Sequence, residues 1–196
     1  MILPVIAYGD PVLRKLADPI DSDYPQLATL IENMWETMYH ASGVGLAAPQ
    51  IGLPIRLFVI DASPFGEDED LPVAEREFLK NFKRVFINAK IESESGDFWA
   101  FNEGCLSIPD VREEVTRQES VRLTFQDESF NTHSEVFEGL LARIIQHEYD
   151  HIEGILFTDK LSSFKKRLLK GRLLDISKGK IRVDYKMRFP DQRRGR

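Results

Sequence analysis

The sequence predicts an α+β fold in a single domain spanning residues 1–196. Segments with the apolar spacing of helices alternate irregularly with segments rich in β-branched and aromatic residues, and no repeated β-α-β order connects them. A chain of 196 residues is long enough for one hydrophobic core, and 42% hydrophobic with 30% charged residues is typical of a folded protein. We expect mixed and antiparallel sheets packed around a central helix.

The composition also excludes several classes of protein. The one cysteine cannot form an internal disulfide, which excludes a disulfide-stapled secreted scaffold. No segment approaches the roughly 18 consecutive apolar residues of a membrane span, and the first ten residues lack the basic region of a signal peptide. We therefore expect a cytoplasmic protein without a membrane partner.

The first half of the chain predicts one helix and two strands. Pro25 suits the first turn of the helix, and apolar residues then recur in one stripe at Leu27, Leu30, Ile31, Met34 and Met38. Residues 55–60 and 85–91 are rich in β-branched and aromatic side chains and predict strands. The acidic, proline-containing segment 61–72 between them predicts a solvated loop.

The second half predicts two helices and two strands. Residues 121–125 alternate as in a strand, and residues 137–151 have helical spacing with Gly154 placed to end the helix. Residues 161–174 predict a basic amphipathic helix. The strict alternation of residues 181–189 predicts a final strand.

The net charge of −6 conceals an uneven distribution. Residues 160–196 carry fourteen of the 26 Lys and Arg and three acids, a local net charge of +11, so residues 1–159 carry −17. This difference predicts that the basic C-terminal helix and strand meet an anionic partner. A solvated helix face followed by a strand edge is the alternative. The overall charge gives no reason to expect DNA binding.

The segment His147-Glu148-Tyr149-Asp150-His151 predicts a metal site. Four residues turn a helix by about 400°, so both imidazoles project from one face and can reach one metal ion. Glu148 lies beside them, where a carboxylate can act as a base toward water. The alternative is a surface helix that happens to hold two histidines.

A hydrolytic metal site takes three protein ligands, and the third is not adjacent in the sequence. Phe157 stands where one familiar class has a histidine, and no glutamate follows Glu153, as a second class requires. Asp159 and Asp175 remain formal candidates. Cys105 is another, because a thiolate binds zinc or iron; its flanking residues indicate a shaped loop. The alternatives for Cys105 are an inert buried thiol and the nucleophile of a Cys/His protease.

The third unusual segment is the glycine-containing run of residues 43–52. Its glycines indicate backbone that approaches a ligand closely, and Gln50 supplies a neutral amide donor. It matches neither phosphate-loop pattern, which argues against nucleotide binding. A turn that ends the preceding helix is the alternative.

Together, the three segments resemble the peptide deformylase family. Its signatures Gly-x-Gly-Leu-Ala-Ala-x-Gln, Glu-Gly-Cys-Leu-Ser and Gln-His-Glu-x-Asp-His occur here in family order at residues 43–50, 103–107 and 146–151. The resemblance implies an α+β metal-dependent hydrolase that removes the formyl group from the N-terminal formylmethionine of new polypeptides and releases formate.

The resemblance also implies roles for individual residues, with one divalent metal ion per chain. It makes the metal ligands Cys105, His147 and His151. Glu148 is the implied acid and base, and Gln50 and the backbone N–H of Leu106 bind the oxyanion. The family implies Fe²⁺ as the working ion; Zn²⁺, Ni²⁺ and Co²⁺ are alternatives, and a Cys/His₂ set accommodates both iron and zinc.

The substrate-binding residues implied in the same way are Gly43, Val44, Gly45, Glu103, Gly104, Leu140, Arg143 and Ile144. Gly45 and Gly104 line the extended substrate backbone, whereas Val44, Leu140 and Ile144 form the methionine pocket or belong to the core. Arg143 departs from the family pattern, because many relatives have an apolar residue there.

The expected partners are formylated nascent peptides and, through residues 160–196, the ribosome. A metal endopeptidase and a non-enzymatic scaffold on a structural zinc site are the competing functions.

Overall fold

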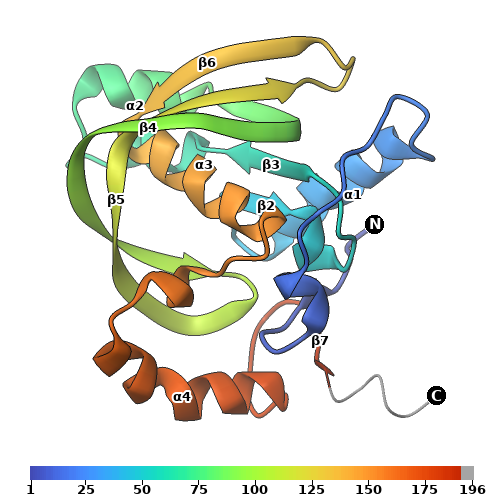
Figure 1. Cartoon of the computed structure of the whole chain (residues 1–196), viewed down its shortest axis with the longest axis vertical. Coiled ribbons are helices and arrows are strands. Elements are labelled where there is room, and N and C mark those ends of the chain that lie inside the picture. Colours follow the sequence, from blue (N-terminus) through green and yellow to red (C-terminus); the bar gives the residue numbers. More distant parts are fainter. Residues whose placement is uncertain (191–196) are drawn as a thin grey trace.

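A five-stranded antiparallel sheet with the helix α3 packed against it forms the centre of the structure, a computed structural model in which residues 1–190 are described (Figure 1). The strand order is β2-β3-β4-β5-β6. The strands are β2 (Gly45–Ala47), β3 (Leu57–Asp61), β4 (Lys83–Cys105), β5 (Ile108–Gln126) and β6 (Thr132–Glu138). The predicted α+β class with an antiparallel sheet and a central helix is confirmed.

Strands β4 and β5 are much longer than the predicted strands 85–91 and 121–125. They form one hairpin ribbon of 23 and 19 residues whose pairing shifts register at four places. Such irregularities bend and twist a ribbon. Figure 1 shows it curving from the sheet down toward α4. Its tip, the turn Leu106–Ser107, therefore lies far from the strands that pair with its base.

Helix α3 (Gly139–Ile152) fills the space that this curved ribbon encloses (Figure 1). One face joins the main core through Leu141, Ala142 and Ile145. The helix begins two residues later than predicted, because Phe137 pairs with Val121 as part of β6. Gly154 has φ +71°, the left-handed conformation that commonly follows a helix, so the predicted end is confirmed.

Helix α1 (Leu27–His40) packs against β2 and β3 through Ile31, Met34 and Met38. Pro25 lies outside the helix rather than in its first turn, since the intervening Gln26 has φ 56° and cannot be helical. Strand β3 begins at Leu57, two residues after the predicted start.

Helix α2 (Val73–Lys80) follows the predicted acidic loop and is not anticipated by the sequence patterns. The loop itself contains the short 3-10 helix Ser63–Glu67, and further 3-10 helices span Pro11–Arg14, Ala48–Ile51 and Phe157–Lys160.

Helix α4 (Ser163–Ser177) confirms the predicted basic helix, but not its amphipathic stripe. Leu173 and Ile176 are buried against the tip of the ribbon. Three other apolar side chains are exposed to solvent: Phe164, Leu168 and Leu174. The helix therefore presents apolar and basic residues together on its outer surface.

The predicted strand 181–189 is wrong in length. Only Met187–Arg188 (β7) forms a ladder, in parallel with the two-residue strand β1 (Val5–Ile6). Burial nevertheless alternates from residue 181 to residue 187, with the apolar side chains half-buried and the charged ones exposed. The alternation correctly reports an extended segment with one covered face, because that pattern does not require a hydrogen-bonded neighbour strand.

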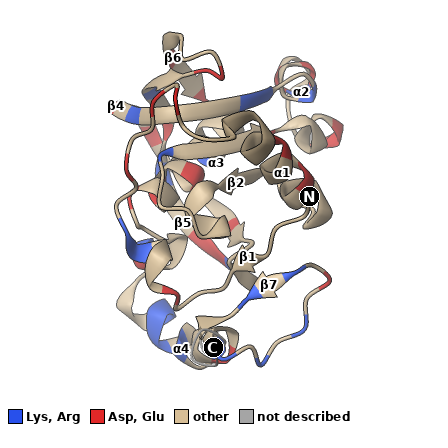
Figure 2. Ribbon diagram, turned by 90° about the vertical axis from the view of Figure 1, so that its right-hand side faces the viewer, with Lys and Arg blue, Asp and Glu red and all other residues tan. Residues whose placement is uncertain are grey.

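The uneven charge is visible in the structure. Figure 2 shows Lys and Arg concentrated on α4 and on the chain leading to β7, whereas much of the acidic charge lies on the upper elements. Residues 191–196, which carry three arginines of the basic segment, lie outside the described residues. Of the helices in residues 1–190, none is long and apolar enough to cross a membrane.

Candidate metal centre and active site

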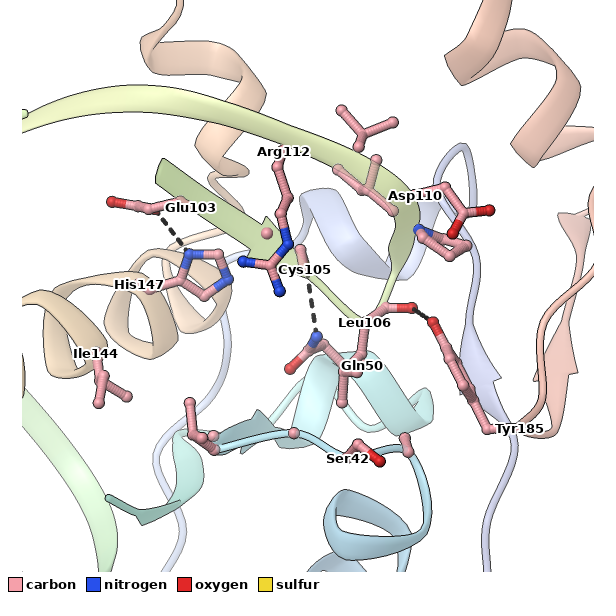
Figure 3. Close-up of a pocket in the computed structure, with 18 of the residues that line it drawn as sticks. Ser42, Gln50, Glu103, Cys105, Leu106, Asp110, Arg112, Ile144, His147 and Tyr185 are labelled. Carbon is pink, nitrogen blue, oxygen red and sulfur yellow. Dashed lines mark hydrogen bonds and ion pairs between the residues drawn. The ribbon is translucent and has the colours of Figure 1, made fainter. Parts of the chain in front are cut away.

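The three motif segments meet at one cavity of about 820 Å³ (Figure 3). Its walls come from the end of β4, from α3, from the segment before and within β2, and from the C-terminal tail. Most of the predicted site residues line it: Gly43, Val44, Gly45, Gln50, Glu103, Gly104, Cys105, Leu106, Arg143, Ile144, His147 and Glu148. His151 lies deeper, with 1% of its surface exposed.

The sulfur of Cys105 and one nitrogen each of His147 and His151 all lie within 4.8 Å of one another. Sγ of Cys105 is 3.3 Å from Nε2 of His151. Cys105 is the last residue of β4, and β5 begins at Ile108, so the shaped loop predicted around Cys105 is limited to the two-residue turn Leu106–Ser107. The ribbon tip and α3 thus bring together ligands separated by more than forty positions in the sequence.

This donor set fits a divalent cation. One thiolate and two imidazoles are ligands that iron and zinc accept, and three ligands leave a coordination position open. Burial alone lowers the pKa of His147, but its hydrogen bonds with Cys105 and Glu103 and the charges of Cys105 and Glu148 raise it well above its ordinary value. The same negative surroundings favour a metal cation at this place. Burial and the charge of His147 lower the pKa of His151, which keeps that ring neutral, as a ligand must be.

Glu103 orients His147. The Nδ1–H of His147 donates a hydrogen bond of 2.9 Å to Oε2 of Glu103, which leaves Nε2 for the metal. A carboxylate behind a ligating histidine fixes its tautomer and ring orientation. Both carboxylate oxygens of Glu103 already accept hydrogen bonds from protein groups. Its direct contact with substrate stays a prediction.

Two buried arginines hold Glu103. Arg117 binds both carboxylate oxygens, at 2.7 and 3.0 Å, and also donates to Asp150 at 2.7 Å. Arg143 donates to Glu103 at 3.0 Å and to the carbonyl of Trp99 at 2.7 Å. Burial would raise the pKa of Glu103, but the hydrogen bonds and charges of Arg117 and His147 lower it far below its ordinary value. Arg143 is therefore part of this ion network as well as of the cavity wall.

Glu148 follows His147 on helix α3, and its surroundings differ from those of Glu103. Its Oε2 is buried and has no hydrogen-bond partner among the described residues. Burial and, to a smaller extent, the charge of Glu103 raise the pKa of Glu148 to about 7, although positive charge on His147 opposes this. A carboxylate of this pKa can take up and release protons near neutral pH.

Gly45 permits β2 to approach Glu148. A Cβ atom at Gly45 would lie 2.7 Å from Cδ of Glu148 and would also collide with Oε1. In the structure this backbone approaches the Glu148 side chain, and its predicted approach to a ligand stays a prediction. The turn that ends α1 lies just before this segment, at residues 41–42, and residues 43–52 hold β2 and the 3-10 helix Ala48–Ile51.

Gln50 is fixed with its amino group toward the metal ligands. Its Oε1 accepts a 2.8 Å hydrogen bond from the N–H of Ala47, so Nε2 must face the opposite way. Nε2 lies 3.5 Å from Sγ of Cys105 and 3.4 Å from Oγ of Ser107. The side chain is 2% exposed, and the amide is therefore a positioned, buried donor.

The apolar residues implied for the methionine pocket separate into two groups. Val44 and Ile144 line the cavity. Leu140 is 4% exposed within the main core and is not among the described residues that line the cavity. Its helical spacing with Ile144 does not bring it to the cavity, which lies alongside the next turn of α3.

Four further residues at or behind the cavity are not anticipated by the sequence: Ser107, Arg117, Asp150 and Tyr185. Ser107 and Asp150 lie within the motifs, and Asp150 is three positions from His147 on the same helix. Arg117 carries no local signal, because its pairing with Glu103 depends on the hairpin register. Tyr185 belongs to the alternating tail, whose contact with the site depends on tertiary structure.

Comparison with known proteins agrees with this geometry. A family model described as polypeptide deformylase matches residues 2–167. The chain is 62% identical over 196 residues to a peptide deformylase of Christiangramia forsetii and 61% identical to one of Flavobacterium johnsoniae, with full coverage of both chains in each case. Among solved structures, peptide deformylases of Legionella pneumophila and Thermus thermophilus match with TM-scores of 0.75 and 0.77, at 37% and 38% identity. The match with the Legionella structure covers 92% of this chain and 98% of that one, and the match with the Thermus structure covers 91% and 99%. The chain belongs to the peptide deformylase family.

Proposed function

We propose that the chain removes the formyl group from the N-terminal formylmethionine of new polypeptides by metal-assisted amide hydrolysis, releasing formate. The observation that carries this proposal is the Cys105, His147 and His151 donor set beside the buried Glu148, whose Oε2 has no hydrogen-bond partner within residues 1–190, in an open cavity. We take residues 1–196 as one catalytic unit.

Cys105, His147 and His151 would hold the metal, and Glu103 would keep His147 in the ligating tautomer. When bound, a divalent cation supplies Lewis-acid activation of water and of the formyl oxygen. Family resemblance favours Fe²⁺ over Zn²⁺, Ni²⁺ or Co²⁺. A closed structural zinc site would need a fourth protein ligand, and the cluster in residues 1–190 offers three.

Glu148 accepts the proton from the attacking water and passes it to the departing amine. Its pKa of about 7 suits both directions, since an acid-base group works best when its pKa lies near the working pH. Its exclusion from water at 4% exposure keeps the proton available to the reaction rather than to solvent.

Gln50 and the N–H of Leu106 donate to the oxyanion that forms on the formyl oxygen. Donors that are fixed before the reaction need no reorganisation, and loss of one such donor typically costs about 3–4 kcal/mol. Gln50 meets this condition because Ala47 orients its amide. As a neutral donor it does not add a charge beside the metal.

The substrate backbone lies extended along Gly43, Gly45 and Gly104, and its methionine side chain occupies the cavity beside Val44 and Ile144. Arg143 also lines the cavity, but its side chain is buried and its guanidinium lies 4.4 Å from the centre of the Trp99 ring, so most of its charge is covered by protein.

The basic C-terminal segment docks on the ribosome, where formylated chains emerge. Helix α4 presents exposed Phe164, Leu168 and Leu174 among its basic residues, a combination that suits a surface of RNA and protein. This partner implies a cytoplasmic location. Lys and Arg to Gln substitutions in α4, followed by co-sedimentation with ribosomes at several salt concentrations, test the idea; unchanged binding contradicts it.

Formate release from formyl-Met-Ala-Ser, measured in air and under anaerobic conditions with metal analysis of each sample, tests the activity and the metal together. An internal peptide bond offered in parallel tests the endopeptidase alternative. Cleavage of the internal bond without formate release would overturn the proposal.

A further inference from the structure

The C-terminal tail returns to the active-site cavity. After α4 the chain runs extended through residues 181–189, and Arg182, Val183, Asp184 and Tyr185 form part of the cavity wall. The family model ends at residue 167, before this segment. The extended tail therefore contributes residues to the active-site cavity that have no role in the chemistry proposed above.

The tail is anchored immediately beyond Tyr185. The N–H of Val5 donates to the carbonyl of Lys186, and the N–H of Ala7 to that of Arg188, both at 2.9 Å. Met187 and Phe189 pack against the core cluster that includes Cys105 and Ile108. Tyr185 thus extends from a segment that is tied to the N-terminal strand and to the base of the ribbon tip.

From this position Tyr185 binds the turn that joins β4 to β5. Its hydroxyl donates a 2.7 Å hydrogen bond to the carbonyl of Leu106 (Figure 3). The N–H of Tyr8 donates at 2.9 Å to the carbonyl of the next residue, Ser107. The two terminal segments, which pair with each other as β1 and β7, therefore hold both turn carbonyls.

These contacts replace ladder bonds that the turn residues lack. Pairing of the two strands ends at Cys105 and Ile108, so Leu106 and Ser107 lie outside the ladder. Cys105 fixes the chain before Leu106, and the Tyr185 bond fixes the peptide plane after it. Together, the Cys105 pairing and the Tyr185 bond restrict the two backbone dihedral angles of Leu106, and they thereby restrict the direction of the Leu106 N–H.

We propose that Tyr185 is a positioning residue for deformylation, which holds the Leu106 carbonyl so that the Leu106 N–H points at the oxyanion site. This inference rests on the proposed function, in which that N–H is an oxyanion donor. Its effect belongs to the reaction rather than to substrate binding, because a donor aimed at the developing charge is worth most in the transition state.

Tyr185→Phe in the metal-loaded, full-length chain tests the inference, because it removes one oxygen and keeps the ring. We expect kcat on formyl-Met-Ala-Ser to be about tenfold lower while KM stays within about twofold. Tyr39→Phe is the matched control: its hydroxyl donates a 2.6 Å hydrogen bond to Asp61, and it does not line the cavity. Metal content and thermal unfolding are measured for both variants.

The outcomes separate the inference from the function on which it rests. Formate release by the wild type, with a kcat loss in Tyr185→Phe alone and equal metal content, supports both. A wild type that releases no formate overturns the proposed function. A Tyr185→Phe variant with wild-type kcat, or one whose activity falls only in proportion to lost metal or stability, overturns the positioning role.

Discussion

Glu103 at the end of β4 and Glu148 in the middle of α3 border the same cavity, and each is 4% exposed. Their surroundings are nevertheless opposite. Glu103 accepts hydrogen bonds from Arg117, Arg143 and His147, and Arg117 and His147 lower its pKa, whereas an oxygen of Glu148 has no partner among the described residues and its pKa rises to about 7. Equal burial thus yields a permanent anion at one place and a titrating group at the other.

The two sites differ in whether the desolvation free energy of a buried carboxylate is compensated. At Glu103 cationic partners offset that cost, so the charge can orient a metal ligand. At Glu148 this desolvation is not compensated, so the pKa of the carboxyl group rises and the group can accept a proton near neutral pH. The experiments below test this division of roles.

The largest expected effect is that of Glu148→Gln. The variant keeps the shape of the side chain but cannot accept a proton, so kcat should fall by about 10³–10⁴-fold. Metal content should stay at the wild-type level, because Glu148 is not in the ligand cluster. Formate release and metal analysis on the same preparation measure both, and an active variant would contradict the proposed chemistry.

Glu103→Ala should act on stability and metal binding instead. It leaves Arg117 and Arg143 buried without their main anionic partner, and such a loss typically costs about 3–5 kcal/mol. Metal affinity should weaken by about 10–100-fold, because His147 loses its orienting acceptor. Denaturant unfolding and metal titration provide the measurements. A loss of stability below about 1 kcal/mol would show that the arginines find other partners.

Gly45→Ala should disturb Glu148 without removing it. The added methyl group would lie 2.7 Å from Cδ of Glu148, and we expect kcat to fall on the order of 10²-fold from the displaced carboxylate. Gly171→Ala is the control, since no atom lies within 4 Å of its added Cβ. In the interior of α4 that change should stabilise the protein by about 0.5–1 kcal/mol and leave kcat unaltered.

The smallest effect is expected at an exposed carboxylate with an arginine partner. Glu135 accepts two hydrogen bonds from Arg84, at 2.8 and 2.7 Å, and the two side chains are 35% and 42% exposed. Because solvent screens such a pair, Glu135→Ala should cost at most about 1 kcal/mol of stability and no activity. A loss comparable to that of Glu103→Ala would mean that burial is not what distinguishes the two ion pairs.

Local patterns in the sequence predict the helices better than the strands. The spacing of apolar residues locates α1 and α3 within a few residues, because a helix buries one face through contacts that recur every turn. The ends of β4 and β5 are not predictable in this way, since bulges and partner strands decide where pairing stops. The alternation of residues 181–189 reports a covered face, but the ladder extends only as far as the short strand β1 allows.

By itself, the sequence indicated the donor set of the site: helix geometry places His147 and His151 on one face with Glu148 beside them, and the resemblance to the peptide deformylase family selects Cys105 as the third ligand. Only the tertiary structure decided which groups surround those donors. The curved ribbon brings Glu103 and Arg117 behind His147, β2 brings Gly45 against Glu148, and the tail brings Tyr185 to Leu106. The physical reason is that a pKa or a fixed orientation depends on neighbours in space, and no spacing along the chain specifies those neighbours.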